Sequence, residues 1–244
     1  TTSAGGVTWS APLAVAEGGA PRRDRPWIVP DGARFGIAWS EVGAEGTAWK
    51  YARERAGGSG FEAVSTLDGR TAVQPPSVTS SGIEALLVDH APGNPRVVAL
   101  ERRLVTGSVD VGSERWTFPP EAALLPYSLG AFASRADGEG WVAIPEGDGA
   151  DGDLTLFHRM PGASFREVRG LRSHGATRVG LPWIVPVRDP GRFLAAWIEE
   201  TAPRGWQVRA RLLGPGPAVS RPADVSRDPF TFHEASRTRN IGDF

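Results

Sequence analysis

A carboxylate recurs at one position in each of four similar segments of the sequence. Carboxylates gathered on one face could bind a cation or sugar hydroxyls, or supply the acid and base of a glycosidase. A catalytic pair, however, needs different environments, so that one carboxyl stays protonated while the other is ionised. Repetition at equivalent positions instead favours a shared structural role, such as accepting hydrogen bonds from turn N–H groups. The four residues are Glu41, Asp89, Glu146 and Glu199.

Tryptophans and arginines in the same segments are candidates for ligand binding. Trp49 and Trp206 are predicted to begin third strands near the carboxylates, where an exposed ring would offer a platform to a sugar. Trp39 and Trp197 stand inside apolar runs and are predicted to be core residues. Guanidinium groups suit carboxylate or phosphate ligands, and they equally suit pairing with the acidic residues. The arginines expected on this face are Arg25, Arg70 and Arg178.

A calcium site is the one metal site that the sequence suggests. The loop "EGDGADGD" places Asp148, Asp151 and Asp153 close together, and oxygen ligands so spaced could hold Ca²⁺. Their order does not match an EF-hand loop, and Gly-Asp turns are common, so a solvated turn is favoured. The histidines show no metal-binding spacing, and the chain has no cysteine. We therefore expect no cofactor, with a calcium-stabilised domain as an alternative.

The elements that must position these residues repeat along the chain. "RPWIVPDGARFGIAWSE" returns as "LPWIVPVRDPGRFLAAWIEE", and related Pro-led segments recur at intervals of about 50 residues. Each copy reads as a Pro-led strand, an apolar strand, an alternating strand and a last strand, separated by Gly-rich or polar turns. This period is typical of a four-stranded propeller blade. The Pro-led segments begin at Pro26, Pro75, Pro126, Pro182 and Pro229.

The sequence therefore predicts an all-β fold, a small β-propeller forming a single domain over residues 1–244. The expected full blades are 26–70, 75–120, 124–172 and 178–226. Residues 229–244 read as the start of a further blade, and residues 7–17 read as its last strand. Pairing of the two would close the ring and remove exposed sheet edges. A four-bladed ring is the alternative.

The repeat pattern resembles that of degenerate Asp-box (BNR, sialidase-like) propellers. "SVDVGSERW" carries the Ser, Asp, Gly and Trp of an Asp-box at Ser108, Asp110, Gly112 and Trp116, with one inserted residue and no Thr. The resemblance implies that this segment forms the turn between the third and fourth strands. It implies architecture and not catalysis, because the family uses this box to hold a hairpin turn. The catalytic Arg triad of sialidases has no match, and Tyr51 and Tyr127 fall at ordinary strand positions.

Composition narrows the range of partners. A formal net charge of -1 gives no basic excess for nucleic acid or anionic lipid. The apolar runs are far shorter than the roughly 20 residues that a membrane-spanning helix needs. The sequence opens on "TTSAGG" without an initiator Met, which is typical of a processed product, so we expect an extracytoplasmic protein, periplasmic or secreted, including a lipoprotein.

The leading functional hypothesis is a non-enzymatic binding or scaffolding propeller. The repeats keep scaffold positions alike, and no copy shows a differentiated catalytic set. The expected partner is a protein or a glycan, with the chain as a subunit of an extracytoplasmic assembly. The alternative is a glycoside-acting enzyme, similar to sialidase or furanosidase propellers, that uses the four carboxylates.

Overall fold

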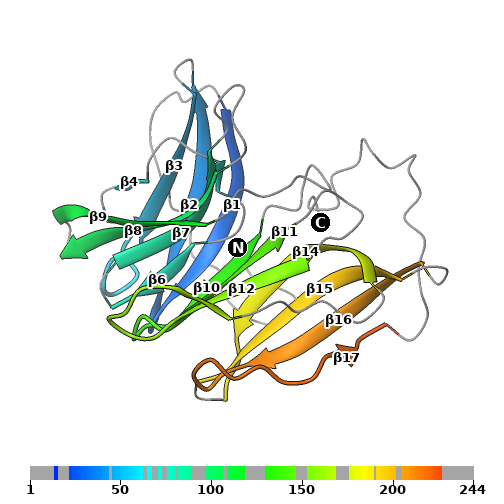
Figure 1. Cartoon of the computed structure of the whole chain (residues 1–244). Coiled ribbons are helices and arrows are strands. Elements are labelled where there is room, and N and C mark those ends of the chain that lie inside the picture. The colour runs from blue at the N-terminus through cyan, green and yellow to red at the C-terminus, as the bar shows by residue number, and fades with distance from the viewer. Residues whose placement is uncertain are drawn as a thin grey trace, which may run out of the picture.

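In the computed structural model, the regular structure of the described residues consists of β-strands, arranged in four antiparallel sheets (Figure 1). None of the described residues lies in a helix that has the length and apolar character needed to cross a membrane. The structure describes residues 14–15, 22–43, 46–62, 65–67, 71–72, 76–80, 82–89, 97–106, 109–118, 130–146, 153–168, 176–189, 191–201 and 205–226.

Each sheet is a meander whose strands pair in chain order, and we number the sheets as blades 1 to 4. Blade 1 consists of β1 (Arg22–Asp31), β2 (Arg34–Gly43), β3 (Gly46–Arg53) and β4 (Ser65–Leu67). In blade 2 the first strand is split into β5 (Thr71–Ala72) and β6 (Ser77–Thr79), and both pieces pair with β7 (Gly82–Asp89). The strands β8 (Val97–Thr106) and β9 (Val109–Phe118) complete it.

Blades 3 and 4 repeat the regular pattern. Blade 3 consists of β10 (Ala131–Ser134), β11 (Gly140–Glu146), β12 (Asp153–Arg159) and β13 (Arg166–Val168). Blade 4 consists of β14 (Ala176–Pro186), β15 (Phe193–Thr201), β16 (Gly205–Leu213) and β17 (Ala223–Asp224). The predicted composite blade of residues 229–244 and 7–17 lies outside the described residues, apart from residues 14–15.

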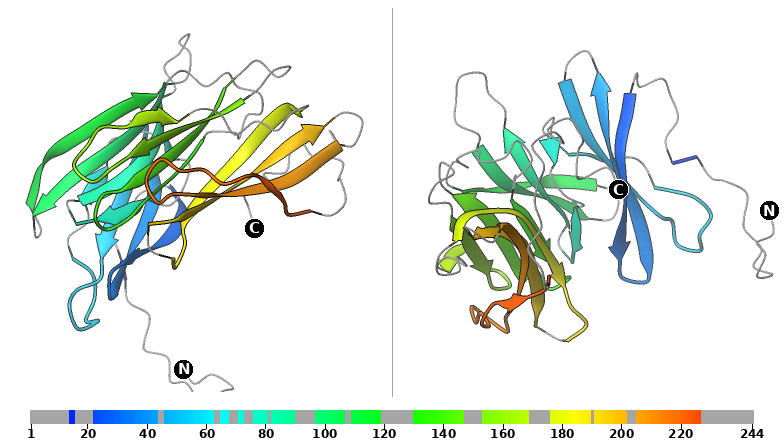
Figure 2. Two further views of the ribbon diagram at one scale, coloured as in Figure 1. Left: turned by 60° about the horizontal axis from the view of Figure 1, so that its bottom comes forward. Right: turned by 90° about the vertical axis from the view of Figure 1, so that its right-hand side faces the viewer.

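The first strands of successive blades are neighbours, which arranges the sheets side by side as propeller blades. β1 contacts β6, β6 contacts β10, and β10 contacts β14. Figure 2 shows the twisted sheets from two further sides. The expected all-β fold of four-stranded antiparallel sheets is confirmed.

The hydrophobic core lies between the blades, since strand side chains alternate between the two faces of a sheet. One cluster joins Val29 and Tyr51 of blade 1 to Ile83 of blade 2. A second joins blades 2 and 3, and a third joins blades 3 and 4. Trp39 and Trp197 are buried as predicted. A blade between two neighbours is covered on both faces, which explains the nearly continuous apolar runs of the second strands.

The repeated segment "PWIV" forms the same local structure twice. The pairing of β1 with β2 shifts register between Asp24 and Trp27, and that of β14 with β15 shifts between Gly180 and Trp183. Each shift encloses a proline, which has no N–H to give to the sheet and is tolerated at bulges. In blade 4 the residue before the proline, Leu181, has a φ of 47°. The sequence repeat is therefore also a repeat of a β-bulge.

Blades 1 and 4 differ in how they fill one packing position. Ala38 lies opposite Tyr51 in blade 1, and the equivalent Ala196 lies opposite Ala210 in blade 4. The Tyr51 ring lies so close over Gly36 that a Cβ atom there would come within 2.3 Å of the hydroxyl oxygen. Blade 4 has Leu194 at the position of Gly36. Blade 1 therefore combines a glycine with a large tyrosine where blade 4 combines a leucine with a small alanine.

The segment that resembles an Asp-box does not form the predicted turn. Asp110, Gly112 and Trp116 lie within β9, where Asp110 is paired with Val105 beside a bulge in the register. Residues 107–108, between β8 and β9, lie outside the described residues, and Ser108 is one of them. An Asp-box hairpin is therefore not part of the structure as described, because the fourth strand begins earlier than the resemblance implies.

Candidate functional site

The four candidate carboxylates all lie at or near the end of a second strand. Glu41 and Glu199 are third from the end of β2 and β15, while Asp89 and Glu146 end β7 and β11. The turns to the third strands follow directly, so the backbone brings these positions to the same end of each blade. We call this end the loop-bearing face. The side chains of Asp89 and Glu146 lie outside the described residues.

In blade 4 the carboxylate is enclosed by an indole and a guanidinium. Trp197 Nε1 donates a hydrogen bond to Glu199 Oε1 at 2.8 Å, and Arg209 Nε donates to Oε2 at 3.2 Å. Trp197 and Glu199 are two residues apart on one strand, so they share a face, and Arg209 pairs directly opposite Trp197. The Glu199 side chain is fully buried. Its charge is therefore balanced by Arg209 within the blade.

Blade 1 contains the same arrangement. Trp39 Nε1 donates to Glu41 Oε1 at 3.1 Å, and Lys50, which pairs opposite Trp39, places Nζ 3.9 Å from Oε2. We call this unit of indole, carboxylate and opposite cation the Trp-x-Glu clamp. Blades 2 and 3 carry Leu87 and Ile144 at the tryptophan position, so the clamp belongs to blades 1 and 4 alone among the described blades. This arrangement agrees with the structural role predicted for repeated carboxylates.

The prediction that Trp49 and Trp206 offer exposed platforms is wrong. Trp49 is 1% exposed and Trp206 is 7% exposed. The Trp49 ring stacks on Trp27 with centroids 4.8 Å apart, inside the cluster between blades 1 and 2. Neither ring presents a face on which a sugar could stack.

Trp49 and Trp206 are also not equivalent positions. Trp49 lies opposite Ser40, whose equivalent in blade 4 is Ile198, because Trp39 corresponds to Trp197. Ile198 lies opposite Val208, and Trp206 lies opposite Glu200, two residues further along the hairpin. The turn between second and third strands is longer in blade 4, so aligning the two hairpins by their tryptophans shifts the register.

For the other predicted site residues, the structure describes the backbone of some and no part of the rest. Arg25 and Arg178 lie in β1 and β14, and Asp153 begins β12 opposite Glu146, but the side chains of these residues are outside the described set. Arg70, Asp148 and Asp151 lie wholly outside it. Within the part of the chain that the structure describes, no three acidic or histidine residues form a group that could hold a metal.

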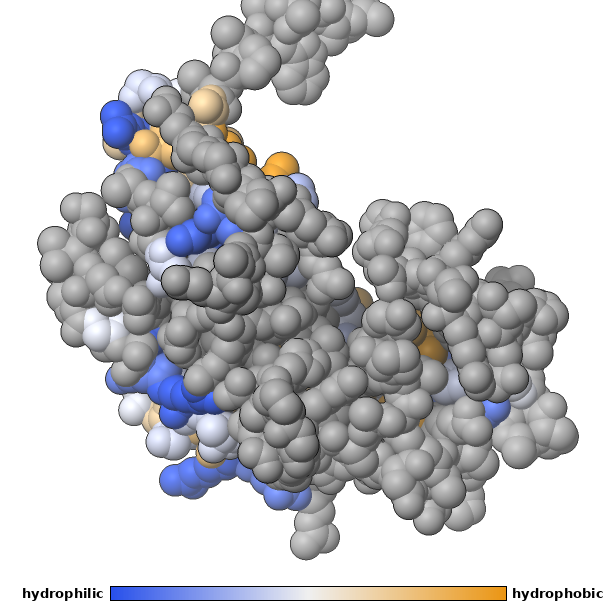
Figure 3. Space-filling model, turned by 90° about the horizontal axis from the view of Figure 1, so that it is seen from above, coloured by the Kyte–Doolittle hydropathy of each residue, from blue (hydrophilic) through white to orange (hydrophobic). Residues whose placement is uncertain are grey.

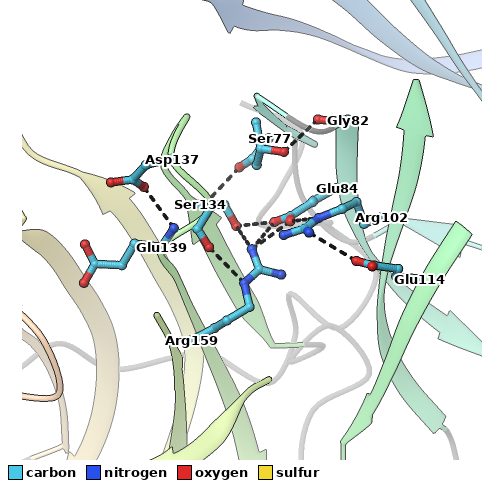
Figure 4. Close-up of polar contacts among 11 residues, drawn as sticks. Ser77, Gly82, Glu84, Arg102, Glu114, Ser134, Asp137, Glu139 and Arg159 are labelled. Atoms are coloured by element: carbon cyan, nitrogen blue, oxygen red, sulfur yellow. Dashed lines mark hydrogen bonds and ion pairs between the residues drawn. The ribbon is translucent and has the colours of Figure 1, made fainter. Parts of the chain in front are cut away.

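A buried ionic cluster between blades 2 and 3 was not predicted from the sequence (Figure 4). Glu84 of β7 is fully buried, and both its oxygens accept from Arg159 Nη2 of β12, at 2.7 and 3.0 Å. Arg102 Nε of β8 donates to Glu84 Oε1 at 2.6 Å, and the Ser134 hydroxyl donates to Oε2. One carboxylate is thus bound from two neighbouring blades.

The Arg159 side chain completes this cluster. Its guanidinium lies 4.9 Å from the Trp116 ring centre and 4.7 Å from the Phe165 ring centre, and Nε donates to Gly138 O at 2.9 Å. Burial lowers the pKa of Arg159, and the negative charge of Glu84 opposes this shift. Glu84 and Arg159 are buried, and both Glu84 oxygens accept hydrogen bonds, so the cluster holds two blades together and does not form a substrate site.

The surroundings of the Tyr51 hydroxyl do not activate it as a nucleophile. Burial is the main cause that raises the pKa of its hydroxyl above the ordinary value of 10.0, and the negative charge of Asp31 raises it further, while Arg53 opposes both. A nucleophilic tyrosine needs its phenolate form stabilised, and here the neutral phenol is favoured. Tyr51 is therefore a core residue.

The raised pKa of Tyr51 predicts a loss of stability in alkali. Above about pH 10 the unfolded chain loses the Tyr51 proton while the folded chain keeps it, so stability present below that pH falls as pH rises towards the folded pKa, by up to about 1.4 kcal/mol per pH unit. The chain has one lysine, Lys50, and two tyrosines, so few other groups titrate in this alkaline range. Urea unfolding between pH 8 and 11 should show this slope in the wild type and a smaller one in Tyr51→Phe. Equal slopes would contradict the assignment.

No protein-family model matches the chain, and no curated protein matches its sequence. Among solved structures, the endo-arabinase from Bacteroides thetaiotaomicron is 12% identical, with 89% of this chain and 85% of that chain covered and a TM-score of 0.41. The xylan β-1,4-xylosidase from Bacillus halodurans is 11% identical, with 88% and 48% covered and a TM-score of 0.45. The catalytic domain of an α-L-arabinofuranosidase from Coprinopsis cinerea is 12% identical, with 91% and 75% covered and a TM-score of 0.42. At these identities the comparisons bear on the fold alone.

Proposed function

We propose that this chain is a non-enzymatic binding or scaffolding propeller that offers its loop-bearing face to a protein partner outside the cytoplasm, as a subunit of an assembly. The observation that carries the proposal is the Trp-x-Glu clamp of blades 1 and 4. It employs two of the four candidate catalytic carboxylates, Glu41 and Glu199, in holding their own blades together.

The clamp argues against acid/base catalysis by these two residues. A glycosidase needs one carboxyl that stays protonated and one that is ionised, hence two different environments. Glu41 and Glu199 have the same kind of indole donor and the same kind of opposite cation. Glu199 is also fully buried, so a substrate could not reach it.

A protein partner is favoured over a glycan because the predicted sugar platforms are buried. With Trp49 and Trp206 in the core, stacking on a sugar would need other rings. The turns that follow the second strands vary in length between blades, which suits recognition of an irregular protein surface. The relation of the blades to Asp-box repeats is part of this proposal and is supported by the sequence pattern alone.

Site-specific photocrosslinking in the native source tests the proposal. A photoreactive residue at Glu200, beside the loop-bearing face, should crosslink to one defined protein, whereas the same residue at Met160, which is 50% exposed at the opposite end of blade 3, should not. The purified chain should show no turnover on an aryl-glycoside panel. Turnover that Asp89→Asn or Glu146→Gln abolishes would establish the enzyme instead, and specific signals on a glycan array would establish a glycan partner.

The variant Glu199→Gln provides the matched control. It removes the buried counter-charge of Arg209, which keeps its ion pair with the exposed Asp224, so we expect a loss of about 1 to 3 kcal/mol in the free energy of unfolding. Crosslinking from Glu200 should persist, because the loop-bearing face is unchanged. Loss of crosslinking at a temperature where the variant is fully folded would place Glu199 in the binding surface and contradict its structural role.

A further inference from the structure

Blade 2 differs from the other described blades in the length of its outer strand. β9 has 10 residues, whereas β4 and β13 have 3 residues each and β17 has 2. One side of β9 pairs with β8 from end to end, and β9 is the last strand of its sheet, so no described strand pairs with its other side. Blade 2 therefore has the longest outer edge among the described blades.

The regular part of this edge is long enough to hold another strand. The register of β9 on β8 shifts near Asp110 and is continuous from Gly112 to Phe118. This stretch contains no proline, so each of its residues carries an N–H group. A typical strand of a globular protein has about 5 to 6 residues. The continuous stretch therefore matches the length of a whole strand.

Solvent reaches the side chains along this edge. Glu114 and Thr117 are exposed, and Trp116 is half-buried. β8 and β9 extend to the left beyond the other sheets in Figure 1, and Figure 3 shows hydrophilic residues (blue) on the same side of the molecule. Every second residue of an antiparallel edge strand directs its N–H and C=O groups away from the sheet, where a further strand can pair with them.

We propose that this edge binds an extended segment of a partner protein, which pairs with β9 as a further antiparallel strand of blade 2. In strand addition of this kind, main-chain hydrogen bonds supply the affinity and side-chain contacts supply the specificity. The inference concerns the outer edge of blade 2 and not the loop-bearing face, so it goes beyond the proposed function and does not depend on it.

The existing neighbour of β9 shows which side chains suit a strand beside it. Arg102 of β8 lies opposite Glu114, and its Nη1 is 3.1 Å from a carboxylate oxygen of Glu114. Leu100 of β8 lies opposite Trp116. Directly opposite residues of an antiparallel pair share a face, so a strand on the far side of β9 meets the same two side chains of β9. The partner segment therefore carries a basic residue opposite Glu114 and an apolar residue opposite Trp116.

A second copy of β9 suits this edge less well than a different sequence does. Two antiparallel copies related by a two-fold axis place residues of the same face opposite each other. Between Gly112 and Phe118, the face that carries Glu114 has no basic residue, and the face that carries Arg115 has no acidic residue. Pairing of two copies would therefore bring no opposite charges together, so we assign the edge to another protein.

A synthetic peptide with the β8 sequence "VVALERRL" (97–104) is the probe, because β8 is the one described strand that pairs with β9. In fluorescence anisotropy it should bind the full chain saturably. Two further peptides carry N-methyl groups at alternate residues, one at the odd and the other at the even positions. One of them should bind more weakly by about tenfold or more, because it loses main-chain hydrogen bonds, and the other should bind like the parent peptide.

A charge reversal at the edge tests the side-chain contact. Glu114→Lys should weaken binding of the parent peptide by about fivefold, because it places like charges opposite each other. A peptide with glutamate in place of the residue that copies Arg102 should restore binding to this variant. Glu167→Lys is the matched control, because Glu167 is exposed on β13, the outer strand of blade 3, and this change should leave peptide binding unaltered.

The absence of saturable binding would overturn the proposal. Unchanged binding of both methylated peptides would show that main-chain hydrogen bonds are not used, and weaker binding of both would show that the peptide replaces β8 inside the sheet. Either result would also overturn it, as would a dimer in light scattering that the peptide dissociates, since a second copy would then occupy the edge. None of these results bears on crosslinking from Glu200, so failure here is distinguishable from failure of the proposed function.

Discussion

Replacing Glu84 with leucine should destabilise the protein by about 3 to 5 kcal/mol, because it leaves the buried Arg159 without its counter-charge and leaves Arg102 with the exposed Glu114 as its acidic partner. In the native cluster Arg159 is held by both Glu84 oxygens and by the Trp116 and Phe165 rings. Its aromatic contacts do not replace the lost negative charge. Urea denaturation monitored by circular dichroism would measure the free energy of unfolding.

The double variant Glu84→Leu with Arg159→Met should be clearly more stable than Glu84→Leu alone, since replacing both ions of a buried pair by apolar groups costs far less than removing one. Glu114→Gln is the control, because Glu114 also bonds Arg102, at 3.1 Å, but its side chain is 49% exposed. Its loss should cost less than about 1 kcal/mol. A Glu84→Leu variant as stable as Glu114→Gln would show that the cluster does not hold blades 2 and 3 together.

The second large effect concerns Gly36. Gly36→Leu should destabilise blade 1 by about 1 to 3 kcal/mol or more, because even its Cβ atom would lie 2.4 Å from two ring carbons of Tyr51. The Tyr51 ring is buried against Ile83 of blade 2 and has little room to move. Thermal and urea unfolding would measure the loss.

Blade 4 supplies the compensating change. Gly36→Leu combined with Tyr51→Ala reproduces the pair formed by Leu194 and Ala210, so the double variant should recover part of the stability lost in Gly36→Leu. The control is Gly36→Ala in the Tyr51→Ala background, where the obstructing ring is gone and the cost should be small. Strict additivity of the two single effects would contradict the equivalence of the blades at this position.

The strands and their repetition could be predicted because both depend on local signals. Alternating and apolar runs, Pro-led starts and Gly turns recur along the chain, and each of them acts over a few residues. The role of Glu41 and Glu199 was also within reach, since residues two apart on a strand share a face. The tryptophan two residues before each of them is the signal that identifies the clamp.

The predictions failed where contacts depend on turn length or on a neighbouring blade. The assignment of Trp49 and Trp206 to equivalent positions of the repeat was wrong, because the longer turn in blade 4 shifts the register of its hairpin. The cluster around Glu84 was missed because nothing in the sequence predicted that the charged face of the alternating third strands, which carries Arg102 and Arg159, would be buried. In a propeller that face also meets another sheet, and strand periodicity says nothing about what lies across it. Glu84, the one acidic residue inside the apolar run "GIEALLV", was the available signal.

The ionic cluster also has a consequence for how the molecule opens. An ion pair, a cation–π contact and an edge-to-face contact between two phenylalanine rings all cross from the second sheet to the third. We therefore expect blades 2 and 3 to exchange their amide hydrogens as one cooperative unit. Blades 1 and 4 are expected to open independently of them.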